Sequence, residues 1–159
     1  MASSAPLSSA LPSYTSSTAD KPLLGMTIGD KFDQIAAQYP DNDALIALHQ
    51  NIHWSYRELQ QEVNRCARAL LAIGVQKGDR VGIWAPNCSE WTLSQFATAK
   101  IGAILVNINP SYRTHELEYA LNQSGARFLI TAHQFKSSNY TAMLYELAPE
   151  LNHCAEGAL

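Results

Sequence analysis

Residues 14–25, YTSSTADKPLLG, contain the residue types from which phosphate-binding loops are made: several hydroxyls, a lysine, a proline and a terminal glycine. Such a loop needs small, flexible residues so that its backbone N–H groups can approach a phosphate. This stretch instead has Ser17 and then Ala19-Asp20, and an aspartate there would repel the ligand. It also follows no predicted strand and begins no apolar helix, which is the context that a phosphate loop requires. We therefore assign these residues to an N-terminal tail.

Two histidines have the spacing of a metal site. His49 and His53 form an H-x-x-x-H pair, which places both rings on one face only if the segment is a helix. The surrounding pattern predicts a hairpin, on which the two residues lie across a turn, and we find no nearby carboxylate in the sequence to complete a site. We expect structural or surface histidines here.

A second pattern, HELE at residues 115–118, imitates the start of a zincin helix. The second histidine of that motif would have to stand at position 119, which is Tyr119. Glu116 and Glu118 fall in the first turns of a predicted helix, where negative charge favours the N-terminal end of the helix dipole. We interpret both as structural and assign no metal-binding residue.

Two loops are better placed for function. WAPN at 84–87 and NINPSY at 107–112 follow the carboxyl ends of two predicted parallel strands, the side on which open α/β sheets bind ligands. Asn87 and Asn109 are the candidates for ligand contact, and the alternative, which we favour, is turn chemistry that ends each strand and prepares the next helix. Three aromatic residues nearby are expected in the core and not in a ligand pocket: Trp84, Trp91 and Phe96.

The totals allow one ordinary domain. The chain has 159 residues, 47% of them apolar, and a net charge of −3, which is too mild to indicate a nucleic-acid or membrane partner. Three cysteines, far apart and without a C-x-x-C pair, indicate neither a disulfide framework nor a zinc knuckle. No apolar run approaches the roughly 20 residues that cross a bilayer. We expect a water-soluble protein in a reducing compartment.

The first third of the chain divides into a tail and three elements. Residues 1–22 hold seven Ser, four Ala, three Pro and two Thr, a composition that predicts disorder. Thr27 is a plausible N-cap for a helix with an apolar stripe from Ile28 to Tyr39, ended by Pro40. Residues 44–49 and 52–54 indicate a hairpin. Ser55 and Glu58 then form a capping box for a helix that Gly74 ends.

The remainder repeats a unit of strand, helix and glycine. Apolar strands are predicted at 79–84, 103–108 and 127–131, and each follows a glycine near a helix exit. A last helix is expected at about 139–147. Strands that are apolar throughout, joined by helical crossovers of this length, are typical of a parallel sheet with helices packed on it. The fold class is therefore α/β, a partial three-layer arrangement.

Three segments in order carry a resemblance: WSYREL at 54–59, GDRVGIWAPNCSEW at 78–91 and AKIGAILVNINPSYRTHELEYALNQSGARFLIT at 99–131. They resemble the N-terminal part of an AMP-forming acyl-CoA synthetase of the adenylate-forming superfamily, similar to its fatty-acyl and medium-chain CoA ligases. The resemblance covers about residues 23–151. It implies a partial AMP-binding domain at 23–151, between the disordered tail at 1–22 that the composition predicts and an end at 152–159 that shows no pattern and is expected to be unstructured.

The resemblance also implies a chemistry. Family members convert a carboxylic acid and ATP with Mg²⁺ into an acyl-adenylate, which the thiol of coenzyme A then attacks. The phosphate loop, magnesium ligands, ribose acid and catalytic lysine of the family all lie downstream of the matched region. We therefore assign no catalytic, cofactor-binding or metal residue to this chain, and we expect none of ATP, Mg²⁺ and coenzyme A to bind it.

Two functions follow from these patterns. The first is a truncated or partial acyl-CoA ligase, an acid-thiol ligase by resemblance, whose isolated segment is inactive and prone to self-association. The second is a stand-alone, non-catalytic α/β module that binds a partner. We expect a fatty or other carboxylic acid as the substrate of the full-length family and no nucleic-acid partner. The expected location is the cytoplasm, because no clear mitochondrial presequence is present. The mitochondrion is the open alternative.

Overall fold

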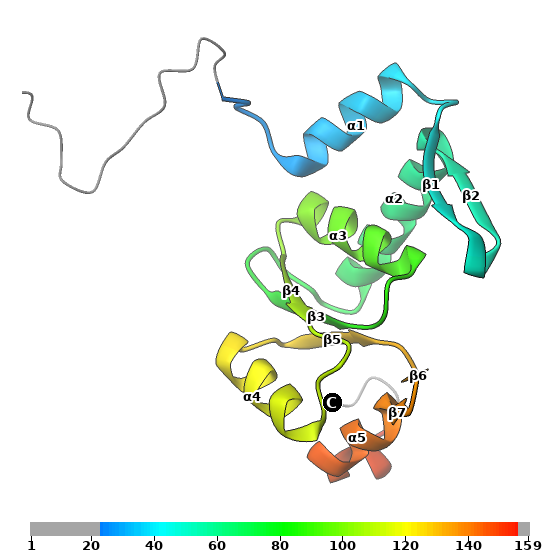
Figure 1. Ribbon diagram of the computed structural model, residues 1–159. Helices are drawn as coiled ribbons and strands as arrows, with labels where there is room; N and C mark the ends of the chain where they lie inside the picture. The colour runs from blue at the N-terminus through cyan, green and yellow to red at the C-terminus, as the bar shows by residue number, and fades with distance from the viewer. Residues whose placement is uncertain (1–22, 156–159) are drawn as a thin grey trace, which may run out of the picture.

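The computed structural model describes residues 23–155 as a three-layer α/β fold. A central parallel sheet has helices α2 and α3 on one face and helices α4 and α5 on the other (Figure 1). Helix α1 and a small hairpin pack on the outer side of α2 and α3. The tail predicted at residues 1–22 lies outside the described residues, as do residues 156–159.

The N-terminal elements form as the sequence indicates. Helix α1, Ile28–Gln38, has Thr27 as its N-cap, and the Thr27 side chain accepts the backbone N–H of Asp30 at 3.1 Å. The apolar stripe predicted for it is only partly buried, because Ile28 and Tyr39 at its two ends are 62% and 45% exposed. Its buried apolar side chains are those of Phe32 and Ala36.

The predicted hairpin is present, but its first strand ends at Ala47, two residues earlier than expected. Strands β1, Asp43–Ala47, and β2, Ile52–Ser55, pair antiparallel. A short 3₁₀ helix, η1 at Leu48–Gln50, joins them and ends at Asn51, whose φ of 52° is left-handed. Asn tolerates that conformation better than most residues, which explains a hairpin turn without a glycine.

Helix α2, Tyr56–Ala72, confirms the predicted capping box. The backbone N–H of Ser55 donates to Glu58 Oε2 at 2.8 Å, and the backbone N–H of Glu58 donates to Ser55 Oγ at 3.3 Å. The chain leaves the helix at Gly74, which has a φ of 93°. Glycine adopts this backbone conformation readily, whereas other residues would be strained in it.

The three predicted parallel strands form one sheet in the order β4-β3-β5. Their bounds are Arg80–Trp84 for β3, Ile104–Ile108 for β4 and Phe128–Thr131 for β5. Helix α3, Ser89–Ile101, connects β3 to β4, and helix α4, Thr114–Ser124, connects β4 to β5. The central strand β3 is buried from Val81 to Trp84, whereas β4 and β5 are partly exposed because each has one paired neighbour among the described strands.

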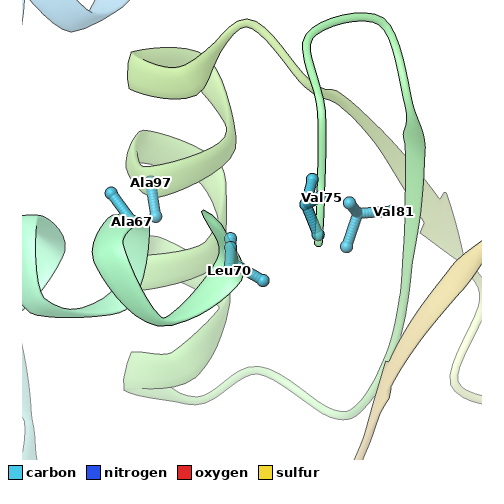
Figure 2. Packing of buried hydrophobic residues seen from close by; sticks show 5 residues of the cluster. All are labelled: Ala67, Leu70, Val75, Val81 and Ala97. Atoms are coloured by element: carbon cyan, nitrogen blue, oxygen red, sulfur yellow. The ribbon is translucent and has the colours of Figure 1, made fainter. Parts of the chain in front are cut away.

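Alternate residues of β3 serve the two faces of the sheet. Val81 belongs to a cluster with residues of α2, α3 and the turn after α2, as Figure 2 shows, and its members are Ala67, Leu70, Val75, Val81 and Ala97. Trp84 belongs to the opposite cluster, with Ile108, Leu117, Tyr140 and Met143 from β4, α4 and α5. Burial of both faces explains why β3 is apolar throughout.

The C-terminal part adds elements that the sequence pattern did not reveal. Two very short strands, β6 at Gln134–Phe135 and β7 at Ser138–Asn139, form a small hairpin after β5. Helix α5, Tyr140–Leu147, matches the predicted last helix and has Asn139 as its N-cap. A 3₁₀ turn, η2 at Pro149–Asn152, follows, and its last residue lies in the end that was predicted to be unstructured. Across residues 23–155, none of the helices has the length and hydropathy of a membrane span.

Candidate functional site

The carboxyl ends of the strands meet at one edge of the sheet. Trp84, the last residue of β3, is paired in register with Ile108 at the end of β4 and with Thr131 at the end of β5. The segments that follow β3, β4 and β5 therefore leave the sheet side by side. This is the edge where the sequence predicted residual function.

A hollow of about 340 Å³ opens at this edge, between the ends of β3 and β5 and the turn of the N-terminal hairpin. Most of its surface is apolar, with a few polar groups. Its lining comes from η1, from residues 85–90 and from the end of β5: His49, Gln50, Ile83, Ala85, Pro86, Asn87, Cys88, Glu90, Ile130, Thr131 and Ala132.

Gln50 ties the hairpin turn to the start of α3. Its Oε1 accepts the backbone N–H of Ser89 at 2.7 Å, and its Nε2 donates to Glu90 Oε2 at 2.8 Å. Ser89 Oγ donates to the same carboxylate at 3.1 Å. The first turn of α3 thus receives its cap from another element, because Cys88 at the N-cap position makes no side-chain capping bond.

The ionisable groups of the hollow are held in place and not activated. Partial burial acts to raise the pKa of Glu90, but hydrogen bonds from Gln50, the helix backbone and Ser89 outweigh it and hold the pKa below its ordinary value. Burial raises the pKa of the Cys88 thiol, and the neighbouring Glu90 carboxylate adds to that shift. A thiol with a raised pKa is a poor nucleophile at neutral pH. The arrangement can bind and orient a group, and it does not present an activated nucleophile.

The two asparagines singled out from the sequence have different places. Asn87 is exposed and lines the hollow. Asn109 holds the turn after β4, because its Oδ1 accepts the backbone N–H of Ser111 at 2.9 Å. Its backbone carbonyl accepts Trp84 Nε1–H at 3.1 Å. Turn chemistry therefore describes Asn109, and Asn87 alone of the pair borders the hollow.

The aromatic residues near this edge have mainly packing roles. Trp84 is fully buried, as expected for a core residue. Trp91 is partly buried and donates from Nε1 to the carbonyl of Ala85 at 2.9 Å. Phe96 is also partly buried and stacks on Phe32, with ring centroids 4.4 Å apart. None of the three lines the hollow.

The histidine pair lies apart, as the hairpin prediction implied. His49 is exposed in η1 at the hollow, whereas His53 is in β2. One detail of the prediction was wrong, since a carboxylate does lie close: Asp43 Oδ1 is 2.8 Å from His53 Nε2 across the hairpin. Both side chains are largely exposed, so this is a surface pair that depends on protonation of the histidine.

The glutamates of the HELE segment lie on α4. Glu116 Oε2 accepts the backbone N–H of Arg113 at 3.1 Å, which confirms the structural interpretation. Bonds from backbone N–H groups at the helix start lower the pKa of Glu116. Glu118 is exposed two residues further along α4.

Sequence reasoning missed Gln50 and Glu90. Gln50 stands between the two predicted strands of the hairpin, and Glu90 follows the predicted strand at 79–84. Neither was given a role. A signal was present, because Glu90 lies in the first turn after the β3 loop, where acidic residues favour the helix N-terminus. Nothing in the local pattern could pair it with a glutamine 40 positions earlier.

Comparison with known proteins identifies the family. The model of the family described as AMP-binding enzyme matches residues 32–156. The mitochondrial medium-chain acyl-CoA ligase ACSF2 of Mus musculus is 42% identical over 147 residues, which cover 92% of this chain and 24% of the relative. This chain thus spans about a quarter of the length of that curated relative.

Solved structures agree with the fold. An inhibitor-bound N-terminal domain of FACL13 from Mycobacterium tuberculosis superposes with a TM-score of 0.67 at 27% identity, covering 83% of this chain and 31% of that one. A fatty acyl CoA synthetase of the same organism gives a TM-score of 0.66 at 29% identity, covering 80% and 23%. The chain belongs to the AMP-binding enzyme family, and it corresponds to the N-terminal portion of the family's acyl-CoA ligases.

Proposed function

We propose that this chain is the N-terminal scaffold of an acyl-CoA ligase that activates a fatty or other carboxylic acid through an acyl-adenylate and transfers it to coenzyme A. The observation that carries the proposal is the family match, which runs through nearly all of the described residues. In this proposal the chain contributes the β4-β3-β5 sheet and the hollow at its carboxyl edge. The reacting groups belong to later parts of a longer polypeptide.

The segment alone is proposed to be inactive. Adenylate formation needs donors for a triphosphate and oxygen ligands for Mg²⁺. Within residues 23–155, no group of three or more His, Cys, Asp or Glu is arranged to hold a metal ion. The single carboxylate among the lining residues, Glu90, is engaged by the Gln50 amide, and the lining has no Lys or Arg for a triphosphate. ATP, Mg²⁺ and coenzyme A are therefore proposed to bind outside this segment.

The division into a tail at 1–22, a partial AMP-binding domain at 23–151 and a C-terminal end at 152–159 remains our proposal. Among residues 23–155 the last element, η2, ends at Asn152, one residue beyond the proposed end of the domain. We also propose that the isolated segment associates with itself. Strands β4 and β5 each have one paired neighbour in the described region, and Ile104 on β4 is 50% exposed.

The compartment is a separate proposal. The name of the mouse relative describes that protein as mitochondrial. This supports the mitochondrion, which the sequence left open, over the cytoplasm. Imaging of the full-length gene product with a C-terminal fluorescent fusion tests it, and a diffuse cytoplasmic signal would decide for the alternative.

A stand-alone binding module is the second candidate. It is favoured by the self-contained packing of residues 23–155, in which buried side-chain nitrogen and oxygen atoms all have hydrogen-bond partners. Such a module would work without ATP. It would be a stable protein of 17.5 kDa.

Two measurements separate the candidates. We expect transcript sequencing to show a reading frame that continues beyond codon 159 into a loop rich in Gly, Ser and Thr. We also expect the purified 159-residue chain to release no pyrophosphate from ATP, Mg²⁺ and decanoate above a no-protein background. A stop codon after Leu159, together with a monodisperse 17.5 kDa protein in cell extracts, would overturn the ligase proposal.

A further inference from the structure

A second hollow, of about 350 Å³, lies beside the start of α1 and is separate from the carboxyl edge of the sheet. We call it the α1 groove. Its lining residues come from the segment before α1, from α1 itself, and from single positions of α2 and α3: Leu24, Met26, Thr27, Ile28, Lys31, Phe32, Ile35, Tyr56 and Phe96. Its volume falls in the range of about 300–1,000 Å³ that is typical of small-molecule sites.

The α1 groove is strongly apolar and is not covered by the described residues. Leu24 is 70% exposed and Ile28 is 62% exposed, although both are large aliphatic side chains. Beneath them the Phe32 ring, only 5% exposed, stacks on Phe96 and provides a rigid aromatic surface. Exposed aliphatic side chains around a buried aromatic stack are typical of a binding groove for an apolar ligand.

Charge on α1 is divided between its two sides. Lys31 is the charged residue among those that line the groove. The two nearby carboxylates, Asp30 and Asp33, line the adjoining polar hollow instead, where Lys100 also lies. Both are engaged, since Thr27 Oγ1 donates to Asp30 at 2.7 Å and Lys100 Nζ donates to Asp33 at 2.5 Å. The groove therefore offers one cation and no carboxylate.

Lys31 has donor capacity to spare. Its ammonium donates one hydrogen bond, to Gln34 Oε1 at 3.0 Å. A lysine carries three N–H donors, so further protons are available for an anionic group. One cation beside an apolar groove is complementary to a linear molecule with a hydrocarbon tail and an anionic head.

We propose that the α1 groove binds a medium-chain carboxylate, with its hydrocarbon tail against Ile28, Ile35 and the Phe32–Phe96 stack and its carboxylate on Lys31. The inference stands independently of the proposed ligase function, because it uses only residues of α1 and its neighbours. It requires no bond to be made or broken.

Equilibrium dialysis of the 159-residue chain with radiolabelled decanoate, below its micellar concentration, tests the proposal. We expect saturable binding that strengthens by up to roughly fourfold for each added methylene from hexanoate to decanoate. A diazirine analogue of decanoate should cross-link to peptides that contain residues 24–35. Absence of saturable binding, or cross-links confined to other peptides, would overturn the proposal.

Substitutions of Lys31 and Ile28 locate the carboxylate head and the hydrocarbon tail of the ligand. Lys31→Gln should weaken decanoate binding several-fold, Lys31→Arg should retain it, and neither should alter the binding of uncharged decanol. Ile28→Gln should weaken the binding of both decanoate and decanol. Ile73→Gln is the matched control, because Ile73 is 64% exposed against 62% for Ile28 and lies outside the groove. Equal effects of Ile28→Gln and Ile73→Gln would contradict the assignment.

A last comparison identifies the source of the ligand. A free fatty carboxylate and an anionic membrane lipid share the chemistry that the groove recognises. We infer the free acid because the groove carries a single cation, Lys31. Decanoate binding should be unchanged by added phosphatidylglycerol vesicles, and the chain should not co-sediment with them. Co-sedimentation that Lys31→Gln abolishes would overturn the choice of the free acid.

Discussion

Trp84 and Tyr140 stack with their ring centroids 3.8 Å apart and an angle of 16° between the ring planes. Trp84 ends β3, Tyr140 begins α5, and both side chains are fully buried. Each also donates a hydrogen bond to the segment after β4, from Trp84 Nε1 to the carbonyl of Asn109 and from the Tyr140 hydroxyl to the carbonyl of Pro110. The pair therefore fixes one of the loops at the carboxyl edge of the sheet.

Substitution separates the hydrogen bond of the Tyr140 hydroxyl from the packing of the two rings. Tyr140→Phe keeps the ring and removes one hydrogen bond, so we expect the free energy of unfolding to fall by about 1 kcal/mol. Trp84→Ala removes the whole buried ring and should cost about 3–5 kcal/mol. Urea unfolding followed by circular dichroism measures both, with Tyr145→Phe on the exposed side of the same helix as a neutral control. Equal losses for the first two variants would contradict this division.

The capping box of α2 predicts a dependence of stability on acid. Hydrogen bonds from the backbone and side chain of Ser55 hold the pKa of Glu58 below its ordinary 4.5. A carboxyl group whose folded-state pKa is lowered stabilises the fold above its unfolded pKa, and this stabilisation is lost as the pH falls through the folded value. The wild-type melting temperature should therefore drop more steeply below pH 4.5 than that of Glu58→Gln.

Removing the other half of the box gives an independent check. Ser55→Ala should reduce the free energy of unfolding at pH 7 by about 1 kcal/mol, since it deletes the N-cap side chain. It should flatten the acid dependence only in part, because it removes the bond from the Ser55 hydroxyl and keeps the bond from the Ser55 backbone N–H, which lowers the Glu58 pKa more. Ser124→Ala, near the end of α4, is the control. Parallel pH curves for wild type and Ser55→Ala would show that the Ser55 hydroxyl has no part in lowering the Glu58 pKa.

Lys100 joins three helices at one point. Its ammonium lies 2.5 Å from Asp33 Oδ1 on α1 and 2.7 Å from Asn64 Oδ1 on α2, and its side chain is only 13% exposed. Partial burial acts to raise the pKa of Asp33, but the hydrogen bonds from Lys100 and Gln60 outweigh it and lower that pKa. This ion pair differs in burial from the pair that Arg57 on α2 forms with Asp41, in which both side chains are exposed.

Lys100→Met should therefore destabilise the fold by about 2 kcal/mol, because it leaves Asp33 and Asn64 without their shared donor. The matched variant Arg57→Met breaks an exposed pair and should change stability by less than about 0.5 kcal/mol. Urea unfolding at pH 7 compares them, and NMR titration should show the Asp33 pKa rising in Lys100→Met. An unchanged Asp33 pKa would rule out the assigned role of Lys100.

Much of this architecture follows from local sequence. The capping box at Ser55 and Glu58 and the apolar run of β3 are short-range patterns, and the structure has both where they were expected. The glycines after α3 and α4 also have the expected left-handed conformation, with φ of 72° at Gly102 and 63° at Gly125. Local chemistry determines such features, so a single sequence contains them.

The candidate sites depend on distant pairs, which local patterns do not encode. Gln50 meets Ser89 and Glu90 across about 40 positions, and Lys100 meets Asp33 across 67. The α1 groove likewise needs Phe32 and Phe96 to stack from different helices. The burial pattern of α1 could not be predicted for the same reason, because exposure of Ile28 depends on which neighbours cover it.

Gln50 offers the sharpest test of the carboxyl-edge hollow. Gln50→Leu should lower the free energy of unfolding by about 1–2 kcal/mol, because the N–H of buried Ser89 loses its acceptor. The Glu90 pKa should rise in this variant, since partial burial already acts to raise it and the Gln50 hydrogen bond opposes that effect. In the wild type, the ionised Glu90 stabilises the fold above its ordinary pKa of 4.5, and this stabilisation is lost as the pH falls through the lowered folded-state pKa. In Gln50→Leu the folded-state pKa is higher, so the loss should occur at a higher pH than in the wild type. NMR titration of the Glu90 carboxyl carbon and urea unfolding measure the two effects, with Gln38→Leu on the exposed end of α1 as control. A fall in stability without any rise in the Glu90 pKa would show that Gln50 braces the helix but does not hold the carboxylate.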